Sequence, residues 1–275
     1  MTQQIDRTND VLMRDEAVGS LIRQWRSTKR RSQMDLALDA GISPRHLSFV
    51  ETGRAKPSAE VLMAIADHMD VPLRTRNTWL LAAGYAPRYS EQGLDSARMM
   101  PVKAAIQRLL DTHDPYPGVA LDKQWNVVLH NQAALKLLGL LPDFLQTPTI
   151  NIFKASLHPQ GFAAMTKNFS EWGSYLVALL QRLMLAGRDE NVMALAAEVA
   201  TYPNVQALKA GTTQATSPES QLLIPCVLEI GGQEISLFTT LTTFGSPRDI
   251  TLNELCIELF YPSDKQAEQF LKAQN

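Results

Sequence analysis

SQMDLALDAGISPRHLSFV, residues 32–50, is the stretch that decides the fold of the first part of this chain. Ser32 is a natural N-cap for a short helix, and Gly41 ends that helix because a C-terminal turn needs a residue that tolerates a positive φ. Ser43 caps a second helix with Pro44 at its first position, where a missing N–H costs nothing. The apolar positions are Met34, Leu36, Ala37 and Leu38 in the first helix and Leu47 and Val50, facing it, in the second. The stretch predicts a helix-turn-helix.

The flanking sequence extends this motif to a small bundle. Apolar residues at helical spacing predict a first helix over about residues 15–28. Ser58 caps a fourth helix, and Pro72 opens a fifth that runs to about residue 82. Five short helices in succession predict an all-α domain, and the second helix of such a motif can place its N-terminal side chains at base edges in a DNA major groove.

The pattern resembles the phage lambda repressor-like, or XRE, DNA-binding domain over about residues 15–85. Besides residues 32–50, the matching positions are Glu51-Thr52-Gly53, Pro57 and Ile65-Ala66. The resemblance implies base contacts from Arg45, His46 and Phe49, and phosphate or backbone contacts from Gln33, Ser43, Ser48, Arg54 and Lys56. Each has an ordinary alternative, since Arg45 can simply be solvated and Phe49 can pack against its own helix. We expect Glu51 to hold an arginine or backbone partner near the helix end.

The charge distribution agrees with DNA binding by the first part alone. Residues 1–90 hold 13 Lys/Arg and 10 Asp/Glu, a net of +3, whereas residues 91–275 hold 13 and 18, a net of −5. The sum is the −2 of the whole chain. A mildly basic head on an acidic body suits a regulator whose head touches DNA.

Cysteine and motif content narrow the remaining classes. Two cysteines in 275 residues exclude a disulfide framework and are typical of the cytoplasm, and both Cys226 and Cys256 lie in apolar strand patterns that predict buried, inert thiols. Residues 1–14 lack the apolar core of a signal peptide, and residues 175–185 are interrupted by polar side chains, so no membrane span is expected. The histidines lack metal-ligand spacing, and GxSxG, P-loop and GxGxxG motifs are absent. We expect a cytoplasmic protein that is not an enzyme and carries no metal or cofactor.

A second domain is expected after a short linker. The predicted division is a flexible leader at 1–14, the DNA-binding domain at 15–87, a linker at 88–97 and a second domain at 98–275. Alternating patterns, with a hairpin signal at Gly231-Gly232, predict strands. These are Pro117–Leu121, Trp125–His130, Leu222–Ile230, Glu234–Thr243 and Glu254–Tyr261. With long helices at about 163–185 and 191–201, the prediction is an α+β domain with a five-stranded antiparallel sheet.

That order of elements resembles a PAS-like domain, with a Trp-bearing strand leading to Asn131-Gln132-Ala133. The tail FGSPRDITLNELCIELFYPSD, Phe244–Asp264, resembles the MmyB-like ligand-binding domain, which stands behind the same type of DNA-binding head. Residues 153–215 depart from the usual family pattern, with fewer Arg and Trp positions. The resemblance implies a small, rather apolar effector, with fatty acids the leading class.

The middle helices carry side chains suited to an apolar pocket. The candidate ligand-binding residues are Phe162, Met165, Phe169, Trp172, Tyr175 and Leu179. The alternative is that they form only the domain core, which is the commoner role of such stripes. If the ligand is an acid, Arg182 or Lys167 are candidates to pair with its head group, although each can equally be a solvated charge.

These observations together predict a transcription regulator that acts as a homodimer on a pseudo-palindromic double-stranded operator, with half-sites about one helical turn apart. The second domain is expected to bind the effector and modulate DNA binding. The alternative is that this domain only dimerises or recruits a protein partner, with no small ligand. A cavity in the domain, or a ligand that co-purifies, separates the two.

Overall fold

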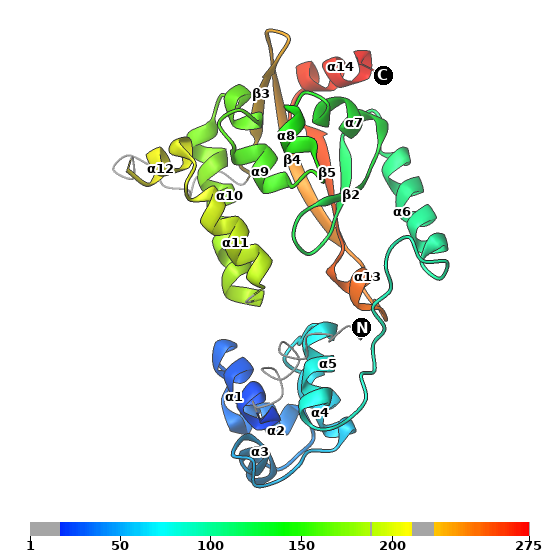
Figure 1. Ribbon diagram of the computed structural model, residues 1–275, viewed down its shortest axis with the longest axis vertical. Coiled ribbons are helices and arrows are strands. Elements are labelled where there is room, and N and C mark those ends of the chain that lie inside the picture. The colour runs from blue at the N-terminus through cyan, green and yellow to red at the C-terminus, as the bar shows by residue number, and fades with distance from the viewer. Residues whose placement is uncertain (1–16, 188, 211–222, 275) are drawn as a thin grey trace, which may run out of the picture. The chain divides into compact units, whose positions relative to one another are not determined.

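A computed structural model describes residues 17–187, 189–210 and 223–274 (Figure 1). The predicted leader at 1–14 lies outside these residues, as does the start of the predicted strand at Leu222. Within the described ranges, no helix combines the length and the apolar character needed to cross a membrane.

The chain forms two compact units that are not two consecutive halves. The first comprises the residues up to Gln92 together with Ser246–Asn253, and the second comprises Gly93–Gly245 and the residues from Glu254 onward. A short segment from the C-terminal part of the sequence therefore belongs to the N-terminal unit.

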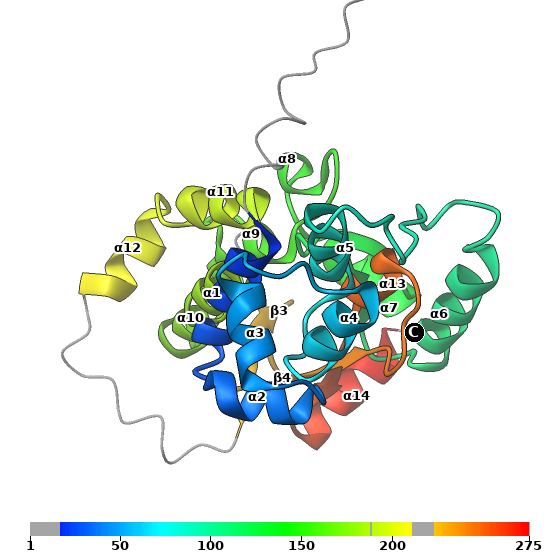
Figure 2. The same ribbon diagram turned by 90° about the horizontal axis from the view of Figure 1, so that it is seen from below.

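The first unit contains the five predicted helices. They are α1 (Val18–Thr28), α2 (Gln33–Asp39), α3 (Pro44–Glu51), α4 (Ala59–Asp67) and α5 (Leu73–Ala82). The three predicted serine caps are confirmed: the hydroxyls of Ser32, Ser43 and Ser58 accept from the backbone N–H three residues on, at 3.1, 3.1 and 3.2 Å. Gly41 has a φ of +67°, as the turn requires. Helix α3 packs against both α1 and α2, as Figure 2 illustrates.

Helix α2 buries less of its apolar surface than its composition suggests. Leu36 and Ala37 are fully buried, whereas Met34 and Leu38 are 63% and 71% exposed. A helix of seven residues that packs on one side presents only one face to the core. Met34, two residues before Leu36, and Leu38, one residue after Ala37, point away from that face. Two large apolar side chains of this helix thus remain on the surface.

A glycine that the sequence analysis did not single out sets how closely α1 approaches α3. A Cβ atom built at Gly19 would lie 2.1 Å from the backbone oxygen of Val50. Because real Cβ atoms do not come so close to backbone, any larger residue would force the two helices apart.

The second unit is built on the predicted five-stranded antiparallel sheet. Its strands are β1 (Gly118–Leu121), β2 (Val127–His130), β3 (Cys226–Ile230), β4 (Gln233–Thr243) and β5 (Cys256–Pro262). Their order among the described residues is β2-β1-β5-β4-β3, and every neighbouring pair is antiparallel. The predicted fold class, an α+β domain with a five-stranded antiparallel sheet, is confirmed. Strand β5 lies at the centre and pairs with β1 on one side and β4 on the other.

Helices cover both faces of the sheet. The described helices of this unit are α6 (Met100–Thr112), α7 (Gln132–Leu138), α8 (Asp143–Gln146), α9 (Ile152–Leu157), α10 (Phe169–Gly187), α11 (Glu190–Val199), α12 (Pro203–Ala210) and α14 (Lys265–Ala273). Ile106 and Leu110 of α6 pack with Ala120 and Ile257 on one face. The main core, on the other face, takes buried side chains from α7 to α12 and from α14.

The long helix predicted at 163–185 is wrong at its start. A 3-10 turn at Phe162–Met165 comes first, and α10 begins only at Phe169. The side chain of Asn168 explains the break, because its Nδ2 donates to the Pro225 carbonyl at 2.7 Å and its Oδ1 accepts from the Val227 N–H at 3.0 Å. These long-range bonds hold the chain against β3, so it cannot continue as a helix. The short helices α8 and α12 were not predicted.

The loop between β4 and β5 contains another helix that was not predicted, α13 (Ile250–Glu254). The Ile250 N–H donates to the Ser90 carbonyl at 2.8 Å, and the Ser90 hydroxyl donates to Asp249 Oδ2 at 2.8 Å. Asn253 Oδ1 accepts from the Leu73 N–H at 3.3 Å, which satisfies a free donor at the start of α5. The segment is bonded into the first unit and continuous with two strands of the second.

Candidate functional site: recognition helix and buried pocket

Helix α3 packs against the core of the first unit with its apolar face and leaves the opposite face accessible. Leu47 and Val50 are buried in the core of the first unit. Arg45 is exposed, and His46 and Phe49 are half-buried. The Arg45 guanidinium carbon lies 5.3 Å from the centre of the Phe49 ring, one turn along the helix. This cation–π contact restrains Arg45 while leaving its N–H groups available.

A buried ion pair joins the ends of three helices behind this surface. Glu51 is 5% exposed, and its two oxygens accept from Arg26 Nε at 2.7 Å and Nη2 at 2.9 Å. The Glu51 carboxylate raises the pKa of Arg26 through this hydrogen bond. Gln33 Nε2 donates to the same carboxylate at 2.6 Å. The expected structural role of Glu51 is confirmed.

The network also orients Gln33, the predicted phosphate contact. One amide N–H of Gln33 bonds to Glu51, which leaves the second for another acceptor. Because Gln33 is the first residue of α2, this amide lies at a helix N-terminus, where backbone donors and the helix dipole favour an anion.

The loop after α3 carries the other predicted phosphate contacts. Arg54 and Lys56 are both exposed. Lys56 Nζ lies 5.0 Å from the centre of the Tyr85 ring, and the Tyr85 hydroxyl donates to the Pro57 carbonyl at 3.1 Å. Ser43 is exposed, and Ser48 is half-buried. All eight predicted DNA contacts lie on α2, α3 or their loops, and their contact with DNA stays a prediction.

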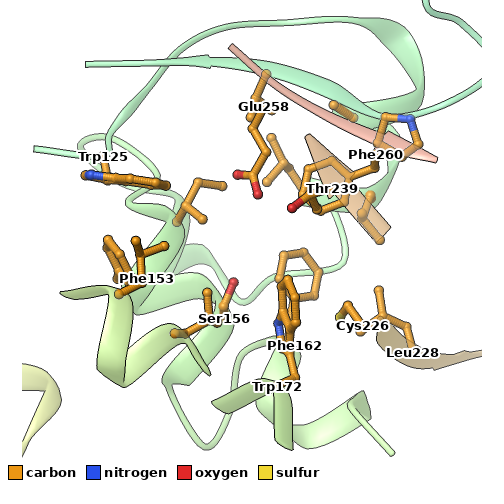
Figure 3. A pocket seen from close by; sticks show the side chains of 18 of the residues that line it. Trp125, Phe153, Ser156, Phe162, Trp172, Cys226, Leu228, Thr239, Glu258 and Phe260 are labelled. Carbon is orange, nitrogen blue, oxygen red and sulfur yellow. The ribbon is translucent and has the colours of Figure 1, made fainter. Parts of the chain in front are cut away.

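The second unit contains a buried pocket between its sheet and its helices (Figure 3). Aromatic side chains form much of its wall, namely those of Trp125, Phe153, Phe162, Trp172, Tyr175 and Phe260. The rings of Trp125 and Phe153 lie 4.9 Å apart, and those of Trp172 and Tyr175 lie 5.3 Å apart. Such a wall is suited to an apolar ligand.

Four of the six predicted ligand-binding residues line this pocket. They are Phe162, Trp172, Tyr175 and Leu179. The other two, Met165 and Phe169, pack against the same core but outside the pocket lining. Met165 falls on the 3-10 turn rather than on the predicted long helix, and the Phe169 ring lies 3.0 Å from where a Cβ of Gly173 would be. Glycine at that position gives the ring its space along its own helix.

The two cations considered for an acidic head group do not face the pocket. Lys167 is exposed and pairs with Glu229, whose carboxylate raises the pKa of the lysine. Arg182 is exposed on α10, and neither residue is part of the pocket lining.

Glu258 is the charged residue among the pocket residues that the sequence analysis missed, which also include Trp125, Phe153 and Phe260. It lies on β5 opposite Val119 of β1 and Leu241 of β4, on the face that points into the pocket. It is 6% exposed, and burial raises the pKa of its carboxyl to about 7. The sequence contains a signal for this residue, because Glu258 is the one carboxylate in the apolar strand pattern CIELFYP. Residues two apart in a strand lie on the same face, which places Glu258 beside Phe260.

The remaining candidate chemistry is modest. Burial raises the pKa of Cys226 to about 12 and that of Cys256 to about 11, which leaves both thiols protonated near neutral pH. In the part of the chain that the structure describes, no group of His, Cys, Asp and Glu side chains is arranged to hold a metal ion.

The fold and the two sites define a DNA-binding regulator with a separate ligand-binding domain. A helix-turn-helix family model matches residues 22–75. The model of the MmyB-like transcription regulator ligand binding domain matches residues 102–273, more than half of the chain. The chain belongs to the family of MmyB-like transcription regulators.

Two solved structures are similar to parts of the chain. The clp gene regulator ClgR from Corynebacterium glutamicum is 24% identical, covering 38% of this chain and 95% of its own, with a TM-score of 0.23. The PAS domain of BvgS from Bordetella pertussis is 17% identical, covering 63% of this chain and 95% of its own, with a TM-score of 0.27. No curated protein matches this chain.

Proposed function

We propose that the chain is a homodimeric, cytoplasmic transcription regulator that binds a small apolar effector in the pocket of its second unit and thereby changes its affinity for a pseudo-palindromic operator. The chain acts by binding and not as an enzyme. The apolar class of effector includes fatty-acid-like molecules. The observation that carries the proposal is the aromatic-lined pocket, which has the sheet on one side. Two strands of this sheet, β4 and β5, continue into the segment that belongs to the first unit.

The chain path supports a route from pocket to head. Thr239 and Leu241 on β4, and Glu258 and Phe260 on β5, line the pocket. The same two strands flank Ser246–Asn253, the segment bonded within the first unit. An effector that shifts these strands acts on the ends of that segment directly. Effector and operator must then change each other's affinity by the same factor, a coupling of typically about 1–3 kcal/mol.

Native mass spectrometry of the purified full-length protein tests the proposal. We expect a dimer that carries one released small molecule per protomer, identified after extraction under denaturing conditions. Operator titrations with the extracted protein, before and after the molecule is added back, should differ in affinity. A dimer without a ligand, whose operator affinity is unaffected by apolar extracts, would favour the alternative of a dimerisation or protein-recruiting domain.

A further inference from the structure

One oxygen of the carboxylate in the pocket has no partner. The Oε2 atom of Glu258 makes no hydrogen bond to any described residue. Thr239 is the polar neighbour whose hydroxyl lowers the pKa of this carboxyl, and Figure 3 shows the carboxylate pointing into the pocket beside Thr239. Leaving a buried carboxylate oxygen unpaired costs free energy, so a donor placed there by a ligand is stabilising.

The rest of the described lining contains no positive charge. No Lys, Arg or His is among these residues, and the other polar groups are neutral, such as Ser156 and Tyr175. Within the described lining, Glu258 is therefore the one acidic charge that a ligand meets.

We infer that the effector carries a hydrogen-bond donor, an amine or a hydroxyl, at one end of an apolar body, and that Glu258 accepts this bond. The inference rests on the proposed function, since it concerns the polar end of the same effector. It narrows the apolar class to alkylamine-like or alcohol-like molecules and places a fatty acid among the poorer ligands.

Electrostatics decide between these head groups. A fatty-acid carboxylate beside Glu258 would bring two like charges together in a low dielectric, so one of them would have to take up a proton. An amine instead forms a hydrogen-bonded ion pair with Glu258, and an alcohol supplies a neutral donor. Because burial raises the pKa of Glu258 to about 7, about half of this carboxyl is charged at neutral pH and most of it at about pH 8.

Three probes with ten carbon atoms each test the inference: decylamine, 1-decanol and decanoate. Each is titrated at about pH 8, above the pKa of about 7 that burial gives Glu258, and below its aggregation concentration, into full-length protein from which bound molecules have been extracted. The fluorescence of Trp125 and Trp172, which line the pocket, reports binding. We expect decylamine to bind at least about tenfold more tightly than decanoate, with decanol between them.

Glu258→Gln keeps the shape of the side chain and removes its charge. The affinity for decylamine should fall by about tenfold and the preference over decanoate should disappear. Glu234→Gln is the matched control, because Glu234 is an exposed carboxylate on β4 outside the pocket lining. Thr239→Val is a second test that keeps Glu258. It removes a hydroxyl that lowers the pKa of Glu258, so less of this carboxyl is charged at the pH of the titration and the preference for decylamine should decrease.

The outcomes separate this inference from the proposed function. Decanoate binding as tightly as decylamine to the unaltered protein overturns the inference and leaves an apolar effector standing. The inference is also overturned if the Glu258→Gln and Thr239→Val variants are folded and both keep an unchanged preference for decylamine. No binding of any probe, together with no co-purified molecule, overturns the inference and the proposed function alike.

Discussion

At the scale of single residues, the two buried carboxylates among the residues that the structure describes differ in their partners. Glu51 is bonded by Arg26 and Gln33, so its charge is compensated and it holds helices together. Glu258 has a hydroxyl neighbour and an unpaired oxygen in an apolar pocket, so its charge is available. A buried charge with a full set of partners is structural, whereas one without them is a candidate for binding.

Breaking the first pair should destabilise the first unit. Arg26→Met leaves Glu51 buried without its cation, a change that costs about 3 kcal/mol or more of unfolding free energy. Urea denaturation followed by circular dichroism measures the loss, and Arg23→Met, an exposed arginine of the same helix, is the control. Equal stability of the two variants would contradict a structural role for this pair.

Glu258 should make the stability of the ligand-free protein depend on pH. Its pKa is about 7 in the folded protein against an ordinary value of 4.5, so the folded state holds the proton more tightly. Unfolding free energy should therefore decrease as pH rises between these two values, by about 3 kcal/mol at most, and then level off. Cys226 and Cys256 near it stay protonated over this range.

Glu258→Gln removes this titration and serves as the comparison. Urea denaturation at about pH 5 and about pH 8 should give a smaller difference for the variant than for the unaltered protein. An unchanged difference would mean that other groups carry the pH dependence.

At the scale of elements, α1 and α3 approach each other closely at Gly19. Gly19→Ala replaces a poor helix former by the best one, which by itself would stabilise α1 by about 1 kcal/mol. The added Cβ would instead meet the Val50 carbonyl at 2.1 Å. We expect a net loss of about 1–3 kcal/mol from overpacking, measured by thermal denaturation. Ser20→Ala, at the exposed neighbouring position, should be neutral, and equal behaviour of the two would refute the close approach.

Helix α3 is the element expected to recognise bases. Arg45→Ala should relax sequence preference at one operator position, a loss of about 1–3 kcal/mol of discrimination. Lys56→Ala should instead weaken all sequences alike and reduce the salt dependence by about one phosphate contact. Selection from a randomised DNA pool, followed by salt titrations, distinguishes the two. Arg108→Ala, an exposed arginine on α6, is the control, and an unchanged binding motif in Arg45→Ala would rule out base recognition by Arg45.

At the scale of the whole molecule, the chain passes between its units three times, after Gln92, Gly245 and Asn253. The last two crossings enclose the segment that Ser90 and Leu73 bind. An effector signal that travels along β4 and β5 depends on this segment staying attached to the first unit.

Loosening that attachment should uncouple the two activities. Asp249→Ala removes the acceptor of the Ser90 hydroxyl. We expect operator affinity and probe affinity to be retained separately, while the about 1–3 kcal/mol by which each ligand affects the other is lost. Operator titrations with and without the tightest-binding probe measure this coupling, and Asp143→Ala, an exposed aspartate on α8, is the control. A full effector response in Asp249→Ala would exclude this route.

The sequence by itself determined the helix-turn-helix with its Gly41 turn, the three serine caps of the first unit and the strands of the five-stranded sheet, since caps, turns and periodicity are local properties of the chain. Only the tertiary structure decided that Gly19 touches a neighbouring backbone, that Asn168 stops a helix by bonding to β3, and that Glu258 faces a pocket. It also decided that Ser246–Asn253 belongs to the first unit. These features depend on contacts between residues far apart in sequence, which local spacing does not encode.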